Sequence, residues 1–240
     1  MPDLPPAGSA VHLLRWAGGA LFGASLLFVG WRFLVPWGVP AAGPLAGPVT
    51  WNACLFTAFA LHHSLFARLG LRDVIRRAVG PGLERTAYVI VASLLFGLVG
   101  AAWRPVPGVW WEAGEPARWG LRALQVVGVW LTLRSAAILD IRDLAGLPPA
   151  RAEGERQAAA ARGFTTRGPY GWVRHPIYLG WLLLVWPVGT MTGTRAAFAL
   201  LSCLYLVVAI PFEERTLLAV DGSYETYRRQ VRWRLIPFLY

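Results

Sequence analysis

A group of polar and aromatic residues stands where a polar stretch meets an apolar run, and its residue types are suited to chemistry. It begins with Gly168-Pro169-Tyr170 and continues through Arg174-His175-Pro176-Ile177-Tyr178-Leu179-Gly180. Two adjacent carboxylates, Glu213 and Glu214, close the next apolar run. Guanidinium and carboxylate groups form charge-assisted hydrogen bonds, and imidazole transfers protons near neutral pH. We therefore expect the functional site at these two segments.

The composition indicates that this site belongs to a membrane protein. Of the 240 residues, 56% are hydrophobic and only 15% are charged, whereas a typical soluble domain has about 25% charged residues. Several apolar runs reach the roughly 17–25 residues that cross a bilayer. We predict an all-α, polytopic transmembrane bundle of about six helices, the fifth of them short and either tilted or partly re-entrant. The runs are Leu13–Val35, Val49–Ala67, Thr86–Trp103, Trp119–Leu139, Ile177–Met191 and Ala196–Phe212.

The first run has one alternative interpretation, a secretory signal peptide. Acidic and proline-rich residues precede it, and it lacks the basic leader of such a peptide. It also belongs to a series of similar runs. We therefore interpret it as the first membrane span.

The basic residues indicate the topology. All 23 are arginine, and the formal net charge is +10. They gather in polar segments that six spans place on one side of the membrane, which the positive-inside rule makes cytoplasmic. Both termini then lie in the cytoplasm, and this distribution argues against nucleic-acid binding. The segments are Arg68–Arg85, Arg142–Arg174 and Arg215–Arg234.

We expect one integral-membrane domain over residues 1–240. Its first four helices cover 1–139, a cytoplasmic loop covers 140–176, and a catalytic hairpin and tail cover 177–240. Within the loop, Pro148–Arg162 is expected to be irregular or a short surface helix. The last residues are expected to fold back over the cytoplasmic mouth of the hairpin.

The short link between the last two spans predicts how the site is assembled. Only Thr190–Thr194 joins them, so we expect a tight helical hairpin that returns the Glu213-Glu214 pair to Arg174, His175 and Tyr178. A proline at position 176 suits the first turn of a helix, whose positive end attracts anions. A glycine at position 180 leaves room for a ligand or another helix.

Other polar and aromatic residues are interpreted as structural. Cys54 and Cys203 lie in apolar runs and suit buried small side chains better than a disulfide. His62 and His63 are expected to be satisfied within the bundle, because adjacent helical residues point apart and do not readily ligate one metal. No Cys/His spacing resembles a zinc site. Four tryptophans are expected to form an interfacial belt around the outer loop: Trp103, Trp110, Trp111 and Trp119.

The motif resembles the integral-membrane methyltransferases that include isoprenylcysteine carboxyl methyltransferase and phospholipid N-methyltransferases. Their Arg-His-Pro-x-Tyr-x-Gly stretch and later Glu-Glu pair are similar to Arg174–Gly180 and to Glu213-Glu214. The stretches Tyr224–Arg228 and Leu235–Phe238 are similar to the end of that family's sequences. This resemblance covers the last third of the chain.

The rest of the chain resembles a narrower bacterial group, the methanethiol S-methyltransferases and their nitric-oxide-reductase-associated relatives. The similar stretches are His63–Arg68, Glu84–Val89, Trp103–Pro105 and Thr190–Thr192. Ile138–Leu144 departs from the Gly-Leu-Arg-Gln-like stretch of that group. The resemblance implies an enzyme of the bacterial inner membrane.

The resemblance also implies S-adenosylmethionine as methyl donor and a small or lipophilic acceptor, with a thiol favoured and a lipid amine or an isoprenoid left open. Nearby arginines would favour the thiolate form of a thiol. Glu213 or Glu214 would accept hydrogen bonds from the donor's ammonium or ribose, and His175 would bind the donor or act as a base. Arg174 would hold the donor's carboxylate, and Tyr170, Tyr178 or Trp181 would face its sulfonium.

These implied roles give three sets of site residues. The catalytic residues are Arg174, His175 and Glu214. The donor-binding residues are Tyr170, Arg174, His175, Pro176, Tyr178, Leu179, Gly180, Glu213 and Glu214. The acceptor-binding residues are Trp181, Tyr227, Arg228 and Arg234.

Three other functions stay open. Some nitric-oxide-reductase-associated relatives resemble isomerases that hold haem, for which His63 and His175 would be the ligands. An NADPH-dependent membrane reductase shares features of the last third of the chain, although no Gly-x-Gly-x-x-Gly fingerprint follows a strand. A non-catalytic scaffold would leave Glu213 and His175 freely replaceable.

Overall fold

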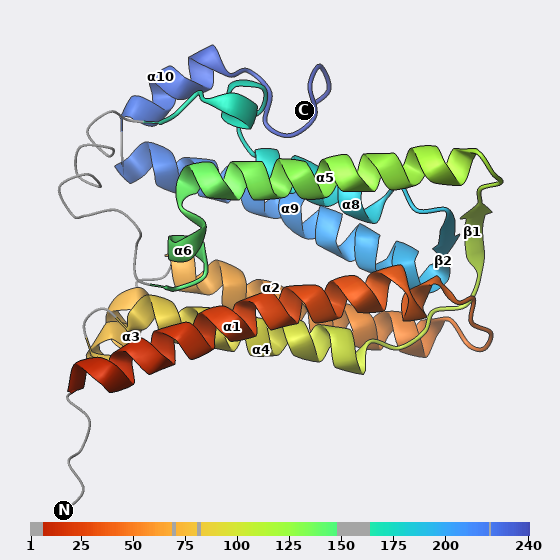
Figure 1. The fold of residues 1–240 in the computed structure, drawn as a ribbon, viewed down its shortest axis with the longest axis horizontal. Coiled ribbons are helices and arrows are strands. Elements are labelled where there is room, and N and C mark those ends of the chain that lie inside the picture. Colours follow the sequence, from red (N-terminus) through yellow and green to blue (C-terminus); the bar gives the residue numbers. More distant parts are fainter. Residues whose placement is uncertain (1–6, 69–70, 81–82, 148–163, 221) are drawn as a thin grey trace, which may run out of the picture. The chain divides into compact units, whose positions relative to one another are not determined.

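The computed structural model describes residues 7–68, 71–80, 83–147, 164–220 and 222–240, which are mainly helical (Figure 1). The predicted all-α polytopic bundle is confirmed. Among the described helices, four are long and apolar enough to cross a membrane: Gly8–Gly38, Glu84–Ala102, Ala117–Leu139 and Gly193–Ala219. The element expected at Pro148–Arg162 lies outside the described residues.

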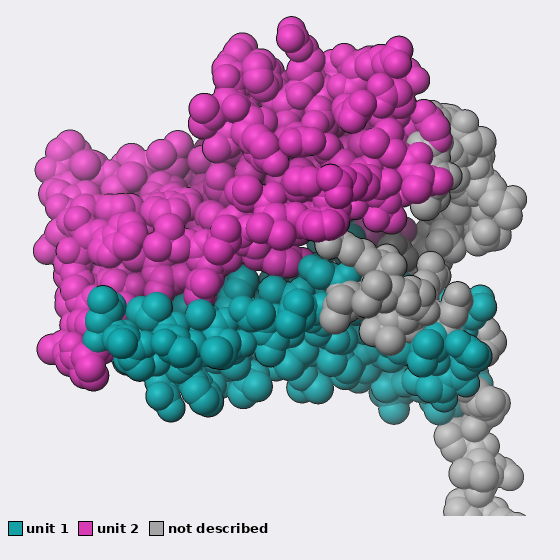
Figure 2. Space-filling view, turned by 180° about the vertical axis from the view of Figure 1, so that it is seen from behind, with its two compact units in different colours: residues 1–37, 45–105, 141–150 teal, residues 38–44, 106–140, 151–240 magenta. Residues whose placement is uncertain are grey.

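The chain divides into two compact units, which Figure 2 colours separately. Unit 1 comprises residues 1–37, 45–105 and 141–150, and unit 2 comprises residues 38–44, 106–140 and 151–240. The single domain over residues 1–240 stays a prediction.

Unit 1 is a set of helices in which α4 packs against both α1 and α2. A Cβ at Gly100 of α4 would lie 2.9 Å from side-chain atoms of Phe28 and Val29, so the glycine allows the close approach of α1. The Tyr88 hydroxyl lies 2.6 Å from Nδ1 of His63, so the expectation of a satisfied imidazole is confirmed for His63. It is wrong for His62, whose buried Nε2 has no hydrogen-bond partner among the described residues. Cys54 is exposed and not buried as expected. The helices are α1 (Ala7–Leu34), α2 (Ala46–Arg68), α3 (Leu71–Val79), α4 (Glu84–Ala102) and α6 (Ile141–Leu144), with a 3-10 turn η1 (Pro36–Gly38) after α1.

The interfacial belt predicted for four tryptophans is wrong for Trp103, which is buried with its ring 5.4 Å from the ring of Trp37. The cause is a turn after α4. The amide of Asn52 donates to the Arg104 carbonyl at 2.8 Å and accepts from the Arg104 N–H at 2.9 Å. This pairing fixes the backbone next to Trp103. Two other members of the predicted belt are exposed, Trp110 and Trp119.

Unit 2 has α8 in contact with both α5 and α9. A Cβ at Gly128 of α5 would lie 2.7 Å from the Gly180 carbonyl, and a Cβ at Gly180 would lie 2.8 Å from the Gly128 carbonyl. Two glycines therefore let α5 and α8 touch through their backbones. The elements are β1 (Val109–Glu112), α5 (Ala117–Leu139), η2 (Gly168–Gly171), α8 (Pro176–Val185), β2 (Thr190–Thr192), α9 (Gly193–Val220) and α10 (Ser223–Gln230).

The last two spans differ from their predicted bounds. The run Ile177–Met191 contains only the ten-residue α8, because Pro187 cannot continue a helix. The link then forms β2, which pairs antiparallel with β1. The second span continues past Phe212 to Val220, so Glu213 and Glu214 lie inside α9 and not at its end. Leu217 and Leu218, which belong to this extension, pack on a buried cluster around α10.

Candidate active site

The site is built around Glu214, whose side chain is 3% exposed. Its Oε1 accepts a hydrogen bond from Nε of Arg174 at 2.6 Å and another from the Tyr224 hydroxyl at 3.2 Å. Its Oε2 accepts from Nε of Arg234 at 3.0 Å. His175 Nε2 lies 3.4 Å from Oε1. The four partners compensate the buried charge of Glu214, which would be very costly alone. Glu214 and these partners are here called the Glu214 cluster.

Arg174 also fastens the residues after α10. Its Nη1 donates to the carbonyl oxygens of Val231 at 2.9 Å and of Arg232 at 2.8 Å. The backbone N–H groups of Arg174 and His175 donate to the carbonyls of Trp233 and Arg234, both at 2.9 Å. Residues 231–234 therefore lie against the start of α8, and the guanidinium of Arg174 is engaged on two sides.

Glu213 has a different environment from its neighbour. Its side chain is 42% exposed, and its Oε2 lies 3.9 Å from Nδ1 of His175. The same oxygen accepts a hydrogen bond from the Tyr178 hydroxyl at 2.8 Å. The rings of His175 and Tyr178 are parallel, with centroids 5.4 Å apart. His175 thus lies between a buried carboxylate and an accessible one.

The sequence predicted the meeting of Arg174, His175 and Tyr178 with the Glu213-Glu214 pair, and these distances confirm that contact. Pro176 occupies the first position of α8, as predicted, and is buried. The Leu179 N–H bonds the His175 carbonyl at 3.1 Å as part of the first helical turn.

Two predicted residues on α8 face neighbouring helices. Gly180 packs against Gly128 and Thr132 of α5, so of the two uses expected for this glycine the structure shows helix packing. Trp181 donates its indole N–H to the Ser202 hydroxyl at 3.0 Å and thereby ties α8 to α9.

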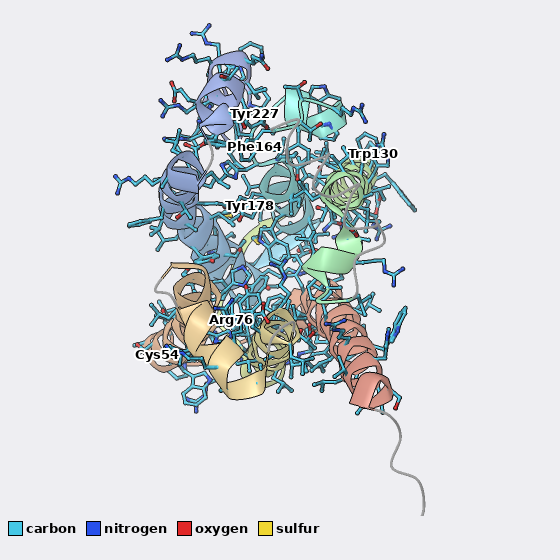
Figure 3. The ribbon with its side chains drawn as sticks, turned by 90° about the vertical axis from the view of Figure 1, so that its left-hand side faces the viewer. Cys54, Arg76, Trp130, Phe164, Tyr178 and Tyr227 are labelled. Carbon is cyan, nitrogen blue, oxygen red and sulfur yellow. The ribbon has the colours of Figure 1, made fainter. Side chains whose placement is uncertain are left out.

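Aromatic residues hold α10 in place beside η2. The Tyr227 hydroxyl donates to the Tyr170 carbonyl at 2.9 Å. The Phe164 and Tyr227 rings stack with centroids 5.8 Å apart, and Figure 3 shows them next to each other above Tyr178. Burial raises the pKa of the Tyr170 and Tyr227 hydroxyls above the usual range, so both stay protonated.

Arg228 lies apart from this arrangement. It pairs with Glu225 on the same helix at 2.8 Å, and its side chain is 41% exposed. Tyr224, by contrast, reaches Glu214 although it was not predicted as a site residue. The sequence signal for Tyr224 was its spacing of three residues from the predicted Tyr227, because residues three apart on a helix lie on the same face. The carbonyl partners of Arg174 carry no signal in the sequence.

Comparisons with known proteins agree with this arrangement. The chain is 37% identical over 221 residues to methanethiol S-methyltransferase of Mycobacterium tuberculosis, a match that covers 90% of each chain. It is 33% identical over 238 residues to methanethiol S-methyltransferase 2 of Bradyrhizobium diazoefficiens, covering 96% of this chain and 91% of that one. It is also 31% identical over 179 residues to Nurim of Sus scrofa, covering 71% and 68%. No family model and no solved structure matches.

The helical membrane bundle and the assembled Arg-His-Pro-x-Tyr-x-Gly and Glu-Glu segments are those of an integral-membrane methyltransferase. With two relatives above 30% identity over nine tenths of their length, the chain belongs to the methanethiol S-methyltransferase family.

Proposed function

We propose that this protein transfers a methyl group from S-adenosylmethionine to a small thiol at the membrane boundary formed by the start of α8. The names of its relatives support the reaction type and the thiol acceptor. The observation that carries the location is the accessible carboxylate of Glu213, which lies beside the stacked His175 and Tyr178 rings and next to the Glu214 cluster.

The accessible groups fit the chemistry of the donor. S-adenosylmethionine carries an ammonium, a carboxylate, ribose hydroxyls and a sulfonium. The Glu213 carboxylate is partly exposed and can accept hydrogen bonds from the ammonium or the ribose. The Tyr178 ring beside it offers a π face to a cation. The carboxylate of Glu214, by contrast, is engaged by protein donors on both oxygens.

This contrast assigns different roles to the two parts of the site. Arg174 and Glu214 are positioning residues, because their charged groups bond each other and the backbone of residues 231–232. They hold His175 at the start of α8. Glu213, His175 and Tyr178 are the residues that contact the substrates.

In the reaction, the acceptor sulfur attacks the methyl carbon while the bond from that carbon to the sulfonium breaks. The electron pair of the broken bond stays on the donor sulfur, which becomes a neutral thioether. The thiol proton passes to Nδ1 of His175, on the side of the accessible Glu213 carboxylate. The carboxylates at 3.9 Å and 3.4 Å stabilise the imidazolium that results.

The membrane setting suits a small lipophilic acceptor, which dissolves in the bilayer and enters from it. The arginine distribution supports an orientation with both termini in the cytoplasm and location in the bacterial inner membrane. The donor would then reach the site from the cytoplasm.

Calorimetric titration of S-adenosylmethionine and S-adenosylhomocysteine into detergent-purified protein tests the proposal. Glu213→Gln should weaken donor binding about 10- to 100-fold, since a hydrogen bond to a charged group contributes about 1.5–3 kcal/mol. Glu225→Gln on α10 is the matched control, because its ion pairs are with Arg228 and Arg229. Binding should be followed by methylation of small thiols, detected as the volatile thioether.

Saturable binding that Glu213→Gln leaves unchanged would contradict the assignment of Glu213. A well-folded protein that binds neither compound would contradict the methyltransferase proposal itself. An absorption spectrum of the same sample tests the haem alternative, which requires a Soret band.

A further inference from the structure

The residues after Arg234 form a closed turn with an apolar tip. The N–H groups of Leu235 and Ile236 donate to the Tyr240 carbonyl at 2.8 and 3.1 Å, and the Tyr240 N–H donates to the Ile236 carbonyl at 3.0 Å. At the tip, Phe238 is 87% exposed and Leu239 is 76% exposed. An ordered turn therefore presents two large apolar side chains outward.

The exposure of this tip is similar to that of the apolar side chains on the spanning helices of unit 2. Comparable exposure of large apolar residues occurs at Val126 on α5 and Leu204 on α9, two helices long and apolar enough to cross the membrane. Figure 1 shows the turn at the end marked C, above α5 in this view.

Basic and aromatic residues precede the tip along the chain. Arg232 is exposed, and the side chain of Arg229 on α10 is 79% exposed and pairs with Glu225 at 3.1 Å. The ring of Trp233 packs on Phe238 with centroids 5.4 Å apart. Tryptophan is enriched at bilayer interfaces, and exposed arginines next to a bilayer bind anionic headgroups.

The turn is connected directly to the Glu214 cluster. Nε of Arg234 donates to Glu214 at 3.0 Å, and its Nη1 lies 3.4 Å from the Tyr240 hydroxyl. The Arg234 guanidinium carbon also lies 5.4 Å from the centre of the Tyr240 ring. The position of the turn therefore affects the arginine that holds Oε2 of Glu214.

We propose that the Ile236–Tyr240 turn inserts Phe238 and Leu239 into the interfacial layer of the bilayer, with Arg229 and Arg232 on anionic phospholipid headgroups. The inserted turn anchors residues 231–234 over the start of α8. The membrane itself thereby stabilises the closed arrangement around Glu214. This inference depends on the membrane location and not on methyl transfer.

The depth of the tip can be measured by fluorescence quenching. Phe238→Cys is made in a Cys54→Ala, Cys203→Ser background, labelled with bimane and reconstituted in vesicles of phosphatidylcholine and phosphatidylglycerol. Thr226→Cys, exposed on α10, is the matched control. Brominated lipid should quench the label at 238 strongly and aqueous iodide weakly, with the reverse at 226. Equal iodide quenching at both positions would overturn the proposal.

The anchoring effect can be measured by trypsin cleavage after Arg229 and Arg232 in nanodiscs. Phe238→Asp should accelerate cleavage several-fold, whereas Phe238→Leu should cleave like the wild type, because it keeps an apolar tip. Thr226→Asp controls for added charge. Unchanged cleavage of Phe238→Asp would overturn the anchoring role. Neither measurement uses the methyl donor or the methyl acceptor. A negative result would therefore contradict the membrane anchoring and leave the proposed methyl transfer untouched.

Discussion

Unit 2 contains a buried arginine at each end, and the two have different surroundings. Arg174 and Arg195 are each only 8% exposed. Arg195 donates from Nη1 to the Thr190 carbonyl at 2.6 Å, and its guanidinium occupies the space where a side chain at position 38 would begin. It fastens the start of α9 to β2, where the neighbouring Thr192 is buried.

At the other end, the Arg174 guanidinium also has several hydrogen-bond partners, but a polar side chain beside it is accessible. Arg174 pairs with a carboxylate as well as with backbone carbonyls, and the next carboxylate along α9, Glu213, is partly exposed. A buried arginine therefore does not mark a functional site by itself. The proposed donor site depends instead on the partly exposed carboxylate of Glu213 beside it, which has capacity left for a ligand.

The largest expected effect is at the center of the Arg174 end. Glu214→Ala leaves the Arg174 guanidinium buried without its carboxylate, and removing one partner of a buried pair costs about 3–5 kcal/mol. The free energy of unfolding in detergent should fall by this amount, with loss of donor binding. Glu225→Ala, on the exposed face of α10, should leave both unchanged. Wild-type stability in Glu214→Ala would show that the cluster is not a structural centre.

The opposite end should respond in stability alone. Arg195→Gln shortens a buried donor and removes its charge-assisted bond to the Thr190 carbonyl, at a cost of about 1.5–3 kcal/mol. Thermal unfolding should occur at lower temperature, while calorimetry should give unchanged donor affinity in the folded protein. A reduced affinity without reduced stability would contradict the contrast between the two ends.

The contact of α5 with α8 gives a smaller effect. A Cβ in Gly180→Ala would lie 2.8 Å from the Gly128 carbonyl, and overpacking of this kind costs about 1–3 kcal/mol. Gly120→Ala is the matched control on α5, because nothing lies within 4 Å of its added Cβ. Denaturation midpoints of the two variants provide the measurement. Equal midpoints would indicate that the helices separate without cost.

The smallest effect concerns pH and α10. Burial raises the pKa of Tyr227 above its usual value, whereas the unfolded hydroxyl ionises near pH 10. The contribution of the protonated Tyr227 hydroxyl to the free energy of unfolding is therefore complete below about pH 10, and it is lost as the pH rises above this value. Tyr227→Phe should lower the free energy of unfolding by about 1 kcal/mol at neutral pH. The free energy of unfolding of this variant should also fall less steeply at high pH. Trypsin cleavage near α10, followed across this pH range, would test the sign.

The assembly of the site was predictable from local features. The apolar runs and the short link between the last two spans required Arg174 and the Glu213-Glu214 pair to meet, and the 2.6 Å contact confirms it. The bounds of the spans were less predictable. The extension of α9 to Val220 depends on packing of Leu217 and Leu218 against the cluster around Tyr224 and Tyr227, which apolar run length does not report.

Other features had no local signal. The pairing of β1 with β2 joins strands about 80 residues apart, since Val109 faces Thr192, and three or four residues are too few for a periodic pattern. Trp103 is buried because the distant Asn52 bonds the backbone beside it. A tryptophan next to a loop is otherwise typical of an interface.

By itself, the sequence predicted the membrane class, the positions of most spans and the meeting of Arg174, His175 and Tyr178 with the two glutamates. Those properties follow from apolar run length, arginine distribution and motif order, which are local. Only the tertiary structure decided that Glu214 is enclosed while Glu213 stays accessible, and that Gly180 serves a helix contact. The two glutamates are adjacent and chemically identical, so their difference arises from which distant donors reach each one. Hydrogen bonds from Arg174, Tyr224 and Arg234 enclose one carboxylate and leave its neighbour available for a ligand.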